Sequence, residues 1–176
     1  MKAEFAIAIY QNTVLIYNPV AGKVRRSGGK IISRAVQALE REGIRVQLMP
    51  TRGPGDAAEL AREAVSKDID LVLIAGGDGT VNEVVNGMAM SHVPLAILPA
   101  GTANVLAIEL GIGKRMERAA AMVNQCVPER ISIGRVETSL GQRYFVCMAG
   151  IGLDAQIVYD LNGQLKAALG KIAYWV

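Results

Sequence analysis

A glycine-rich turn at residues 76–80 is the part of the sequence best suited to chemistry. It reads Gly-Gly-Asp-Gly-Thr and stands between an apolar run at 71–75 and a helical pattern at 80–86, for which Gly87 is the expected stop. Glycines allow backbone N–H groups to approach an anion, and a helix N-terminus adds the positive end of its dipole. The sequence therefore predicts an anion-binding corner here, with phosphate as the expected anion.

Asp78 is the one carboxylate inside this turn. Phosphates would repel it unless a metal ion or a proton intervenes, so we consider two chemical roles. The carboxylate holds Mg²⁺, directly or through water, or it accepts the proton of an acceptor hydroxyl. A third interpretation gives Asp78 only a helix-capping role. Asn82, Glu83 and Asn86 follow on the same helix, where a solvated helix face is the alternative to a functional role.

Alternating strands and helices must position this turn. Apolar runs predict buried strands at 14–17, 44–49, 71–75 and 94–98, and helical spacing predicts helices at 30–42, 56–66, 80–86, 103–110 and 115–125. Asp56, with Glu59 three residues on, resembles the start of a capping box. This order indicates an α/β fold, a parallel sheet with flanking helices.

The carboxyl ends of parallel strands lie at one edge of a sheet, so the loops at Asn18, Thr51, Gly76 and Gly101 are expected to share one crevice. The loop at 18–29 is rich in glycine and basic residues and is suited to wrap an anion. It is not a Walker A loop, because Lys30 precedes Ile rather than Ser or Thr. Its other basic residues, Lys23, Arg25 and Arg26, are interpreted as solvated.

A second unit is predicted to begin near residue 128. Alternating patterns at 130–138 and 143–148 around a turn at 139–142 indicate an antiparallel hairpin, and a helical pattern runs from 156 to 169. We therefore divide the chain into an α/β domain at 1–127 and the beginning of a β-rich acceptor domain at 128–176, which we interpret as cut short.

Composition narrows the functional classes. The 176 residues carry a net charge of +3, which is too mild for a dedicated nucleic-acid binder. Cys126 and Cys147 lack metal-ligand spacing and are expected to be reduced, buried thiols, as suits the cytosol. Apolar runs are too short to span a membrane, so any membrane contact is expected to be peripheral.

Four motifs in order carry a resemblance to a known family. They are Asn-Pro-Val-Ala-Gly at 18–22, Gly-Gly-Asp-Gly-Thr-Val-Asn-Glu-Val-Val-Asn-Gly at 76–87, Leu-Pro-Ala-Gly-Thr-Ala-Asn-Val-Leu-Ala at 98–107 and Ala-Gly-Ile-Gly-Leu-Asp-Ala at 149–155. Together they resemble the catalytic domain of the diacylglycerol kinases, which includes bacterial lipid kinases and sphingosine kinases. The related NAD kinases share the Gly-Gly-Asp-Gly-Thr element.

The resemblance implies a lipid kinase that transfers the γ-phosphate of ATP, with Mg²⁺, to a lipid hydroxyl. Asp78 would be the catalytic group and Asp154 would lie on the acceptor side, whereas the metal ligands stay unassigned. The implied nucleotide contacts are Asn18, Pro19, Val20, Ala21, Gly22, Thr51, Gly76, Gly77, Asp78, Gly79, Thr80, Val81, Asn82, Glu83 and Thr102. Ala21 stands where many relatives have Ser, and Ile108 where an arginine is common.

Other interpretations stay open at this point. An NAD kinase-like enzyme would share the phosphate chemistry but use a soluble ribose hydroxyl, and a non-catalytic module would bind nucleotide without turnover. The expected location is cytoplasmic, with peripheral contact at the inner membrane surface. The apolar end near Trp175 would favour a homo-oligomer. The identity of the lipid and the activity of this short form are not predicted.

Overall fold

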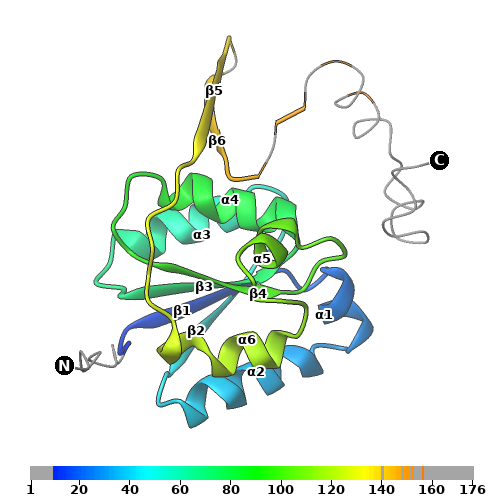
Figure 1. Ribbon diagram of the computed structural model, residues 1–176, viewed down its shortest axis with the longest axis vertical. Helices are drawn as coiled ribbons and strands as arrows, with labels where there is room; N and C mark the ends of the chain where they lie inside the picture. The colour runs from blue at the N-terminus through cyan, green and yellow to red at the C-terminus, as the bar shows by residue number, and fades with distance from the viewer. Residues whose placement is uncertain (1–9, 140, 148, 151, 153–155, 157–176) are drawn as a thin grey trace.

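A four-stranded parallel sheet forms the centre of the computed structural model, which describes residues 10–139, 141–147, 149, 150, 152 and 156. Its strands are β1 (Thr13–Tyr17), β2 (Val46–Pro50), β3 (Leu71–Gly76) and β4 (Leu95–Pro99), in the order β2-β1-β3-β4 (Figure 1). The predicted α/β fold is thus confirmed. The chain leaves β1 toward β2 on one side and returns to β3 on the other, which makes β1 and β3 the switch point of the sheet.

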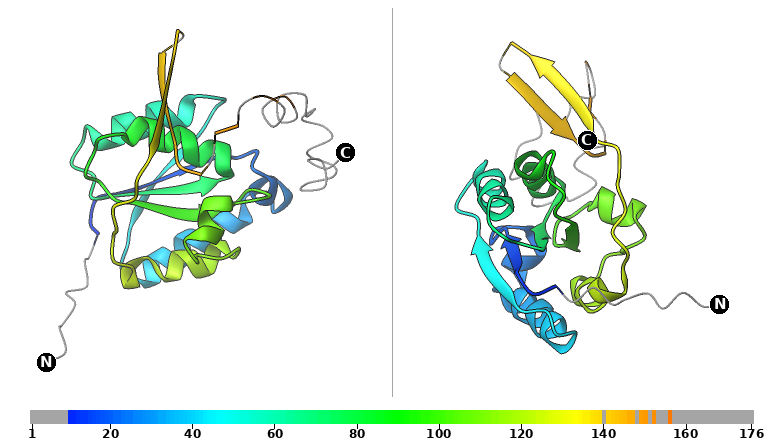
Figure 2. Two further views of the ribbon diagram at one scale, coloured as in Figure 1. Left: turned by 45° about the horizontal axis from the view of Figure 1, so that its top comes forward. Right: turned by 90° about the vertical axis from the view of Figure 1, so that its left-hand side faces the viewer.

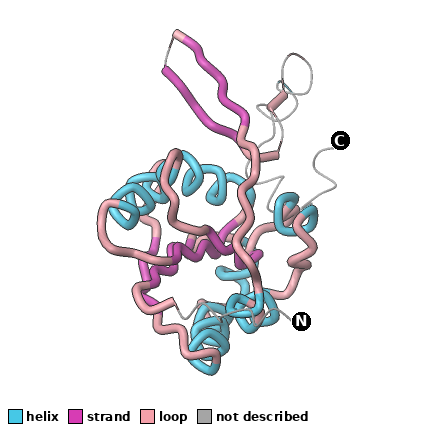
Figure 3. Tube along the Cα trace, turned by 60° about the vertical axis from the view of Figure 1, so that its left-hand side comes forward, coloured by secondary structure: helices cyan, strands magenta, loops and turns pink. Residues whose placement is uncertain are grey.

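Helices cover both faces of the sheet, as the tube in Figure 3 shows. Helices α2 (Lys30–Arg41) and α6 (Met116–Ala121) pack together on one face, and α3 (Asp56–Val65) and α4 (Asp78–Met88) pack together on the other (Figure 1). Shorter elements complete the layer, namely α1 (Gly22–Arg26), α5 (Val105–Glu109) and the 3-10 turn η1 (Val123–Gln125). No helix in the described part of the chain is long and apolar enough to cross a membrane.

The core has two halves because successive strand residues face opposite sides of the sheet. Leu15 and Leu73 pack toward α2 and α6, whereas Ile16 and Ile74 pack toward α3 and α4. All four side chains are fully buried. This two-sided burial explains why β1 and β3 read as unbroken apolar runs rather than as alternating patterns. The edge strand β2 is mostly exposed, so the prediction of a buried strand at 44–49 is wrong for these residues.

A two-stranded antiparallel hairpin stands apart from the sheet. Its strands are β5 (Gly134–Thr138) and β6 (Gly141–Phe145). Both views in Figure 2 place the hairpin beyond α4, on the side of the sheet away from α2 and α6. The predicted hairpin therefore exists with shorter strands. The assignment of residues 128–176 to a separate domain stays a prediction, and the helical pattern at 157–169 lies outside the described residues.

Gly87 does not end a helix, contrary to the sequence prediction. It is buried inside α4, where a β-carbon would lie 2.2 Å from the carbonyl oxygen of Ala58 on α3. Gly87 therefore allows α3 and α4 to pack closely, and the helix continues to Met88.

Other local predictions are also corrected. Residues 22–26 form α1 rather than an open loop. Asp56 is not the N-cap of α3, because Gly55 precedes it in the left-handed conformation and the Asp56 carboxylate accepts a hydrogen bond from the Arg52 backbone N–H, at 2.7 Å. The helix predicted at 103–110 is limited to α5, and the one at 115–125 divides into α6 and η1.

The two cysteines are free thiols, but neither is buried. Cys126 lies just after η1 in the connection to the hairpin, and Cys147 lies just after β6. Both positions are outside the sheet and its helical layers, so the prediction of buried thiols is wrong.

Candidate functional site

A cavity of about 310 Å³ opens at the carboxyl edge of the sheet, beside β1 and β3. Its lining comes from two separate loops and the start of α4: Asn18, Pro19, Val20, Thr51, Arg52, Gly53, Pro54, Gly79, Thr80 and Glu83. In open α/β sheets this edge, at the switch point, is where ligands bind. The loops at Asn18 and Thr51 therefore share a cavity with Gly79 and Thr80, at the end of the glycine turn, whereas Gly76 itself and the loop at Gly101 are not part of its lining.

Asn18 connects the first loop to the glycine turn. Its backbone N–H donates to the carbonyl of Ala75 at 3.0 Å, and its side-chain Nδ2 donates to Oγ1 of Thr80 at 3.3 Å. Its Oδ1 accepts the backbone N–H of Val20 at 2.9 Å, which closes a turn and leaves the Val20 side chain 70% exposed. Asn18 thus determines how the residues after β1 face the start of α4.

The three glycines of the turn serve different purposes. A β-carbon at Gly76 would lie 2.7 Å from Cβ of Thr80, and Gly77 packs against Gly101, where a β-carbon would lie 2.4 Å from Cα of Gly77. Gly79 has nothing within 4 Å of such an atom. Gly76 and Gly101 thus need glycine so that the chain can pack, a β-carbon at Gly77 would meet Cα of Gly101 at a tight 3.3 Å, and Gly79 leaves open space beside the cavity.

Asp78 joins the two glycine corners, which are the turns at residues 76–80 and 101–104. Its Oδ2 accepts the backbone N–H of Asn104 at 2.9 Å, and its Oδ1 accepts that of Val105 at 2.6 Å. Asp78 itself lies in the first turn of α4, so its carboxylate holds the start of another helix, α5. The capping role is present, but each carboxylate oxygen retains a lone pair for a second partner.

Asn104 was not among the predicted contacts, although it organises the second corner. It is 5% exposed and left-handed, with φ of 53°. Its Oδ1 accepts the backbone N–H of Gly101 at 2.7 Å, and its Nδ2 donates to the carbonyl of Gly101 at 2.9 Å. The available signal was an asparagine just before a helix, because asparagine tolerates the left-handed region better than most residues.

Arg52 is a second residue that the sequence analysis missed. It lines the cavity next to Thr51, whose backbone N–H donates to the carbonyl of Tyr17 at 2.9 Å. Glu83 lies among the same lining residues, so the cavity contains one cation and one carboxylate. The signal that could have identified Arg52 was a basic residue two positions after a strand that ends at this edge of the sheet.

Lys23 is held by the protein rather than solvated, which corrects the prediction. Its backbone N–H donates to the carbonyl of Ala100 at 3.1 Å, and its ammonium donates to the carbonyls of Pro99 and Lys114 at 3.2 and 2.5 Å. Burial, together with the nearby charges of Arg26 and Lys114, lowers the pKa of Lys23, while Glu117 opposes that shift. Lys23 thereby fixes α1 to the chain after β4.

Apart from Glu83, which lines the cavity, the remaining predicted contacts lie elsewhere. The side chains of Ala21 and Val81 are buried in the two halves of the core, so their side chains are not available to a ligand. Gly22 begins α1, and Thr102 is exposed outside the cavity lining. Asn82 and Glu83 are half-buried on α4. Asp154 lies outside the described residues.

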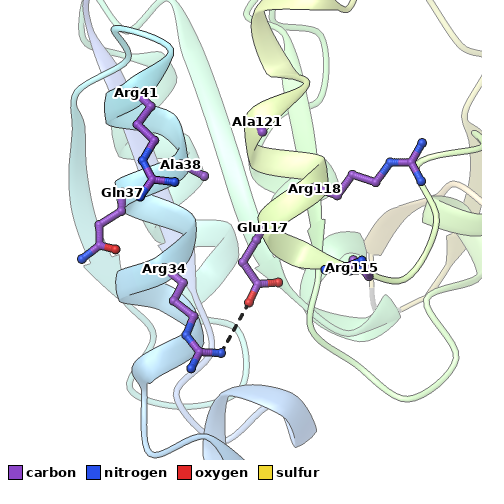
Figure 4. Close-up of a pocket in the computed structure, with 8 residues that line it drawn as sticks. All are labelled: Arg34, Gln37, Ala38, Arg41, Arg115, Glu117, Arg118 and Ala121. Atoms are coloured by element: carbon purple, nitrogen blue, oxygen red, sulfur yellow. Dashed lines mark ion pairs between the residues drawn. The ribbon is translucent and has the colours of Figure 1, made fainter.

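A larger cavity, of about 520 Å³, lies between α2 and α6 (Figure 4). Four arginines and one carboxylate contribute to its lining: Arg34, Arg41, Arg115, Arg118 and Glu117. Glu117 and Arg34 form a long ion pair, with 4.0 Å between the Arg34 nitrogen and the Glu117 oxygen. This groove contains none of the predicted contact residues and no glycine turn.

No group of three or more His, Cys, Asp or Glu side chains capable of holding a metal comes together among the residues that the structure describes. A magnesium ion brought in by a nucleotide needs less, because it is commonly held by one or two carboxylates together with phosphate oxygens. The free lone pairs of Asp78 fit such a role.

Comparisons with known proteins point to one family. The family model described as the diacylglycerol kinase catalytic domain matches residues 12–136. A diacylglycerol kinase of Bacillus subtilis is 39% identical over 165 residues, which cover 92% of this chain and 52% of that protein. One from Staphylococcus haemolyticus is 32% identical over 92% of this chain and 48% of its own length.

A solved structure of a diacylglycerol kinase from Bacillus anthracis is similar with a TM-score of 0.58 and 31% identity. The match covers 66% of this chain and 44% of that one. The chain thus spans about half the length of the curated relatives that it matches. Because the family model covers most of its length, the chain belongs to the diacylglycerol kinase catalytic domain family.

Proposed function

We propose that this chain binds ATP at the carboxyl edge of β1 and β3 and forms the nucleotide half of an ATP-dependent lipid kinase. The observation that carries the proposal is the cavity between the Asn18 loop, the Thr51 loop and the N-terminus of α4. Phosphoryl transfer depends mainly on positioning and on stabilisation of charge, and this edge of the sheet is suited to both.

The phosphates would lie against the first turn of α4. A helix leaves its first N–H groups without partners inside the helix, and its dipole favours an anion at that end. Gly79 and Thr80 belong to this turn and line the cavity, and Gly79 has no side chain to keep a phosphate away. Arg52, on the opposite loop, would add a positive charge.

The remaining roles concern positioning. We propose nucleotide contacts by residues 18–22, Thr51, residues 76–83 and Thr102, through backbone groups where the side chain is buried. Asp78 is proposed to orient Mg²⁺ or to accept the proton of the acceptor hydroxyl. Mg²⁺, when bound with ATP, would neutralise charge on the phosphate oxygens. The two hydrogen bonds from Asn104 and Val105 would hold the Asp78 carboxylate in place for either role.

Family membership favours a lipid hydroxyl as acceptor over a soluble ribose, because the matching relatives are named diacylglycerol kinases. A lipid acceptor would require contact with a membrane surface, and we propose that this contact is peripheral, from the cytoplasmic side. Residues that bind the acceptor are proposed to lie mainly in the part of the relatives that this chain does not span.

The proposal is tested by ATP binding and by phosphate transfer. ATP binding is measured by calorimetry for the parent chain and for Gly79→Leu. Since a side chain at Gly79 meets open space, the variant should keep the parent's melting temperature and bind ATP at least tenfold more weakly. Met90→Leu is the matched control, because Met90 is 84% exposed and lies outside the cavity lining.

Transfer of labelled phosphate is then compared with diacylglycerol in mixed micelles and with NAD. Labelled lipid is the expected result, and labelled NAD would favour the NAD kinase alternative. ATP binding without transfer to either acceptor would favour a non-catalytic module. Equal ATP affinity of the parent and Gly79→Leu would contradict the proposed site.

A further inference from the structure

Asn86 joins α4 to the hairpin through its side-chain amide. Its Oδ1 accepts the backbone N–H of Tyr144 at 2.9 Å, and its Nδ2 donates to the carbonyl of Tyr144 at 2.8 Å. The second Nδ2 hydrogen is available for the carbonyl of Asn82, at 2.8 Å. The amide thus pairs with both the N–H and the carbonyl of Tyr144 in β6, in the way that a neighbouring strand would.

Asparagine is the residue type that this arrangement requires. A primary amide has two N–H donors and a carbonyl acceptor, and all three functions are used here. An aspartate would place an oxygen against two carbonyl oxygens, and an alanine would leave the half-buried N–H of Tyr144 without its partner. The interpretation of Asn86 as part of a solvated helix face is therefore wrong.

The chain after Tyr144 leads directly to the Asp78 corner. Val146 packs against the half of the core that lies under α3 and α4. Burial raises the pKa of the Cys147 thiol, and the charges of Glu109 and Asp78 raise it further, while a hydrogen bond with the Leu106 backbone in α5 opposes this shift. Cys147 is thus near enough to Asp78 for the carboxylate charge to act on its thiol.

Helix α4 is the rigid element between the two ends of this arrangement. Asp78 and Asn86 are eight residues apart on it, which corresponds to roughly 12 Å along a helix. We propose that Asn86 is a positioning residue that fixes the exit of the hairpin on α4, so that Val146 stays packed under α3 and α4 and Cys147 stays near the first turn of α4. The part of this inference that concerns phosphate transfer rests on the function proposed above.

The test compares Asn86→Ala and Asn86→Asp with Asn124→Ala. Asn124 is a matched control, because its Nδ2 also bridges two elements by donating to a backbone carbonyl, that of Glu42 at 2.5 Å, on the other face of the sheet. Three quantities are measured for each protein: hydrogen exchange of the Tyr144 amide, the rate of Cys147 alkylation, and kcat with the dissociation constant of ATP.

Both Asn86 variants should speed Tyr144 exchange at least fivefold and should raise the rate of Cys147 alkylation, and Asn124→Ala should change neither. In an active preparation the Asn86 variants should lower kcat at least fivefold while the dissociation constant of ATP stays within twofold. Unchanged Tyr144 exchange, unchanged Cys147 alkylation or unchanged kcat would each overturn the proposal. If the parent transfers no phosphate, the proposed function fails, and the exchange and alkylation rates alone decide whether Asn86 positions this segment.

Discussion

Replacement of Asp78 by asparagine tests how the two glycine corners are held together. The variant keeps the shape of the side chain but exchanges one acceptor oxygen for an N–H donor. In the parent, both oxygens accept backbone N–H groups, from Asn104 and Val105 at 2.9 and 2.6 Å. An asparagine satisfies only one of them, and its amide group then points at the other donor. The start of α5 should therefore loosen.

The expected loss follows from the hydrogen bonds. A bond to a charged group contributes about 1.5–3 kcal/mol, and a buried donor without a partner is costly in its own right. Because Asp78 is half-exposed and water can reach it, we expect a loss of about 2 kcal/mol in the free energy of unfolding. For a protein of this size that corresponds to a fall of roughly 4–8 °C in melting temperature.

The assay combines thermal unfolding with hydrogen exchange at Asn104 and Val105. Asp56→Asn is the control, because that carboxylate accepts one backbone N–H, from Arg52, and should cost less than about 1 kcal/mol. A melting temperature within 1 °C of the parent, together with unchanged exchange at Asn104 and Val105, would refute the assignment of Asp78 as the connection between the corners.

Three further predictions concern packing and thiol chemistry. Gly101→Ala should lower the free energy of unfolding by about 2 kcal/mol or more and weaken ATP binding, because its β-carbon would press on the Gly77 backbone; calorimetry that finds both unchanged would contradict this. Gly87→Ala should cost at least as much stability, measured by urea unfolding, because the Ala58 carbonyl has no room to move within α3. Cys147 should react with iodoacetamide at pH 8.5 more slowly than the same thiol in an unfolded peptide, because its raised pKa leaves less thiolate. The difference should shrink as the pH rises above the pKa of the folded state. Equal reaction rates at pH 8.5, measured by mass spectrometry, would contradict the raised pKa.

The order of the elements was predictable because the central strands β1 and β3 are buried on both faces and end at turns. Residues 71–75, for example, are apolar throughout and lead into two glycines. The shared edge followed from the rule that parallel strands end together. The local sequence pattern was therefore sufficient to predict which elements occur and in what order.

Properties that depend on contacts between distant residues were not predictable. Gly87 resembles a helix stop, and only the approach of α3 shows that it permits close packing. The Asp78 carboxylate accepts the backbone N–H groups of Asn104 and Val105, which lie 26 and 27 positions further along the chain. Asn86 pairs with a backbone 58 positions away. The neighbouring sequence is the same whether a glycine ends a helix or permits close packing, and whether a polar side chain faces solvent or bonds a distant backbone.

Backbone amide shifts during a titration with ATP are the decisive measurement for ATP binding at the carboxyl edge of β1 and β3. We expect the largest shifts on Val20, Gly79 and Thr80, with little change along α2 and α6. Shifts concentrated at Arg34, Arg41, Arg115 and Arg118, which line the groove in Figure 4, would show that the arginines bind the phosphates instead and would refute the proposed ATP site.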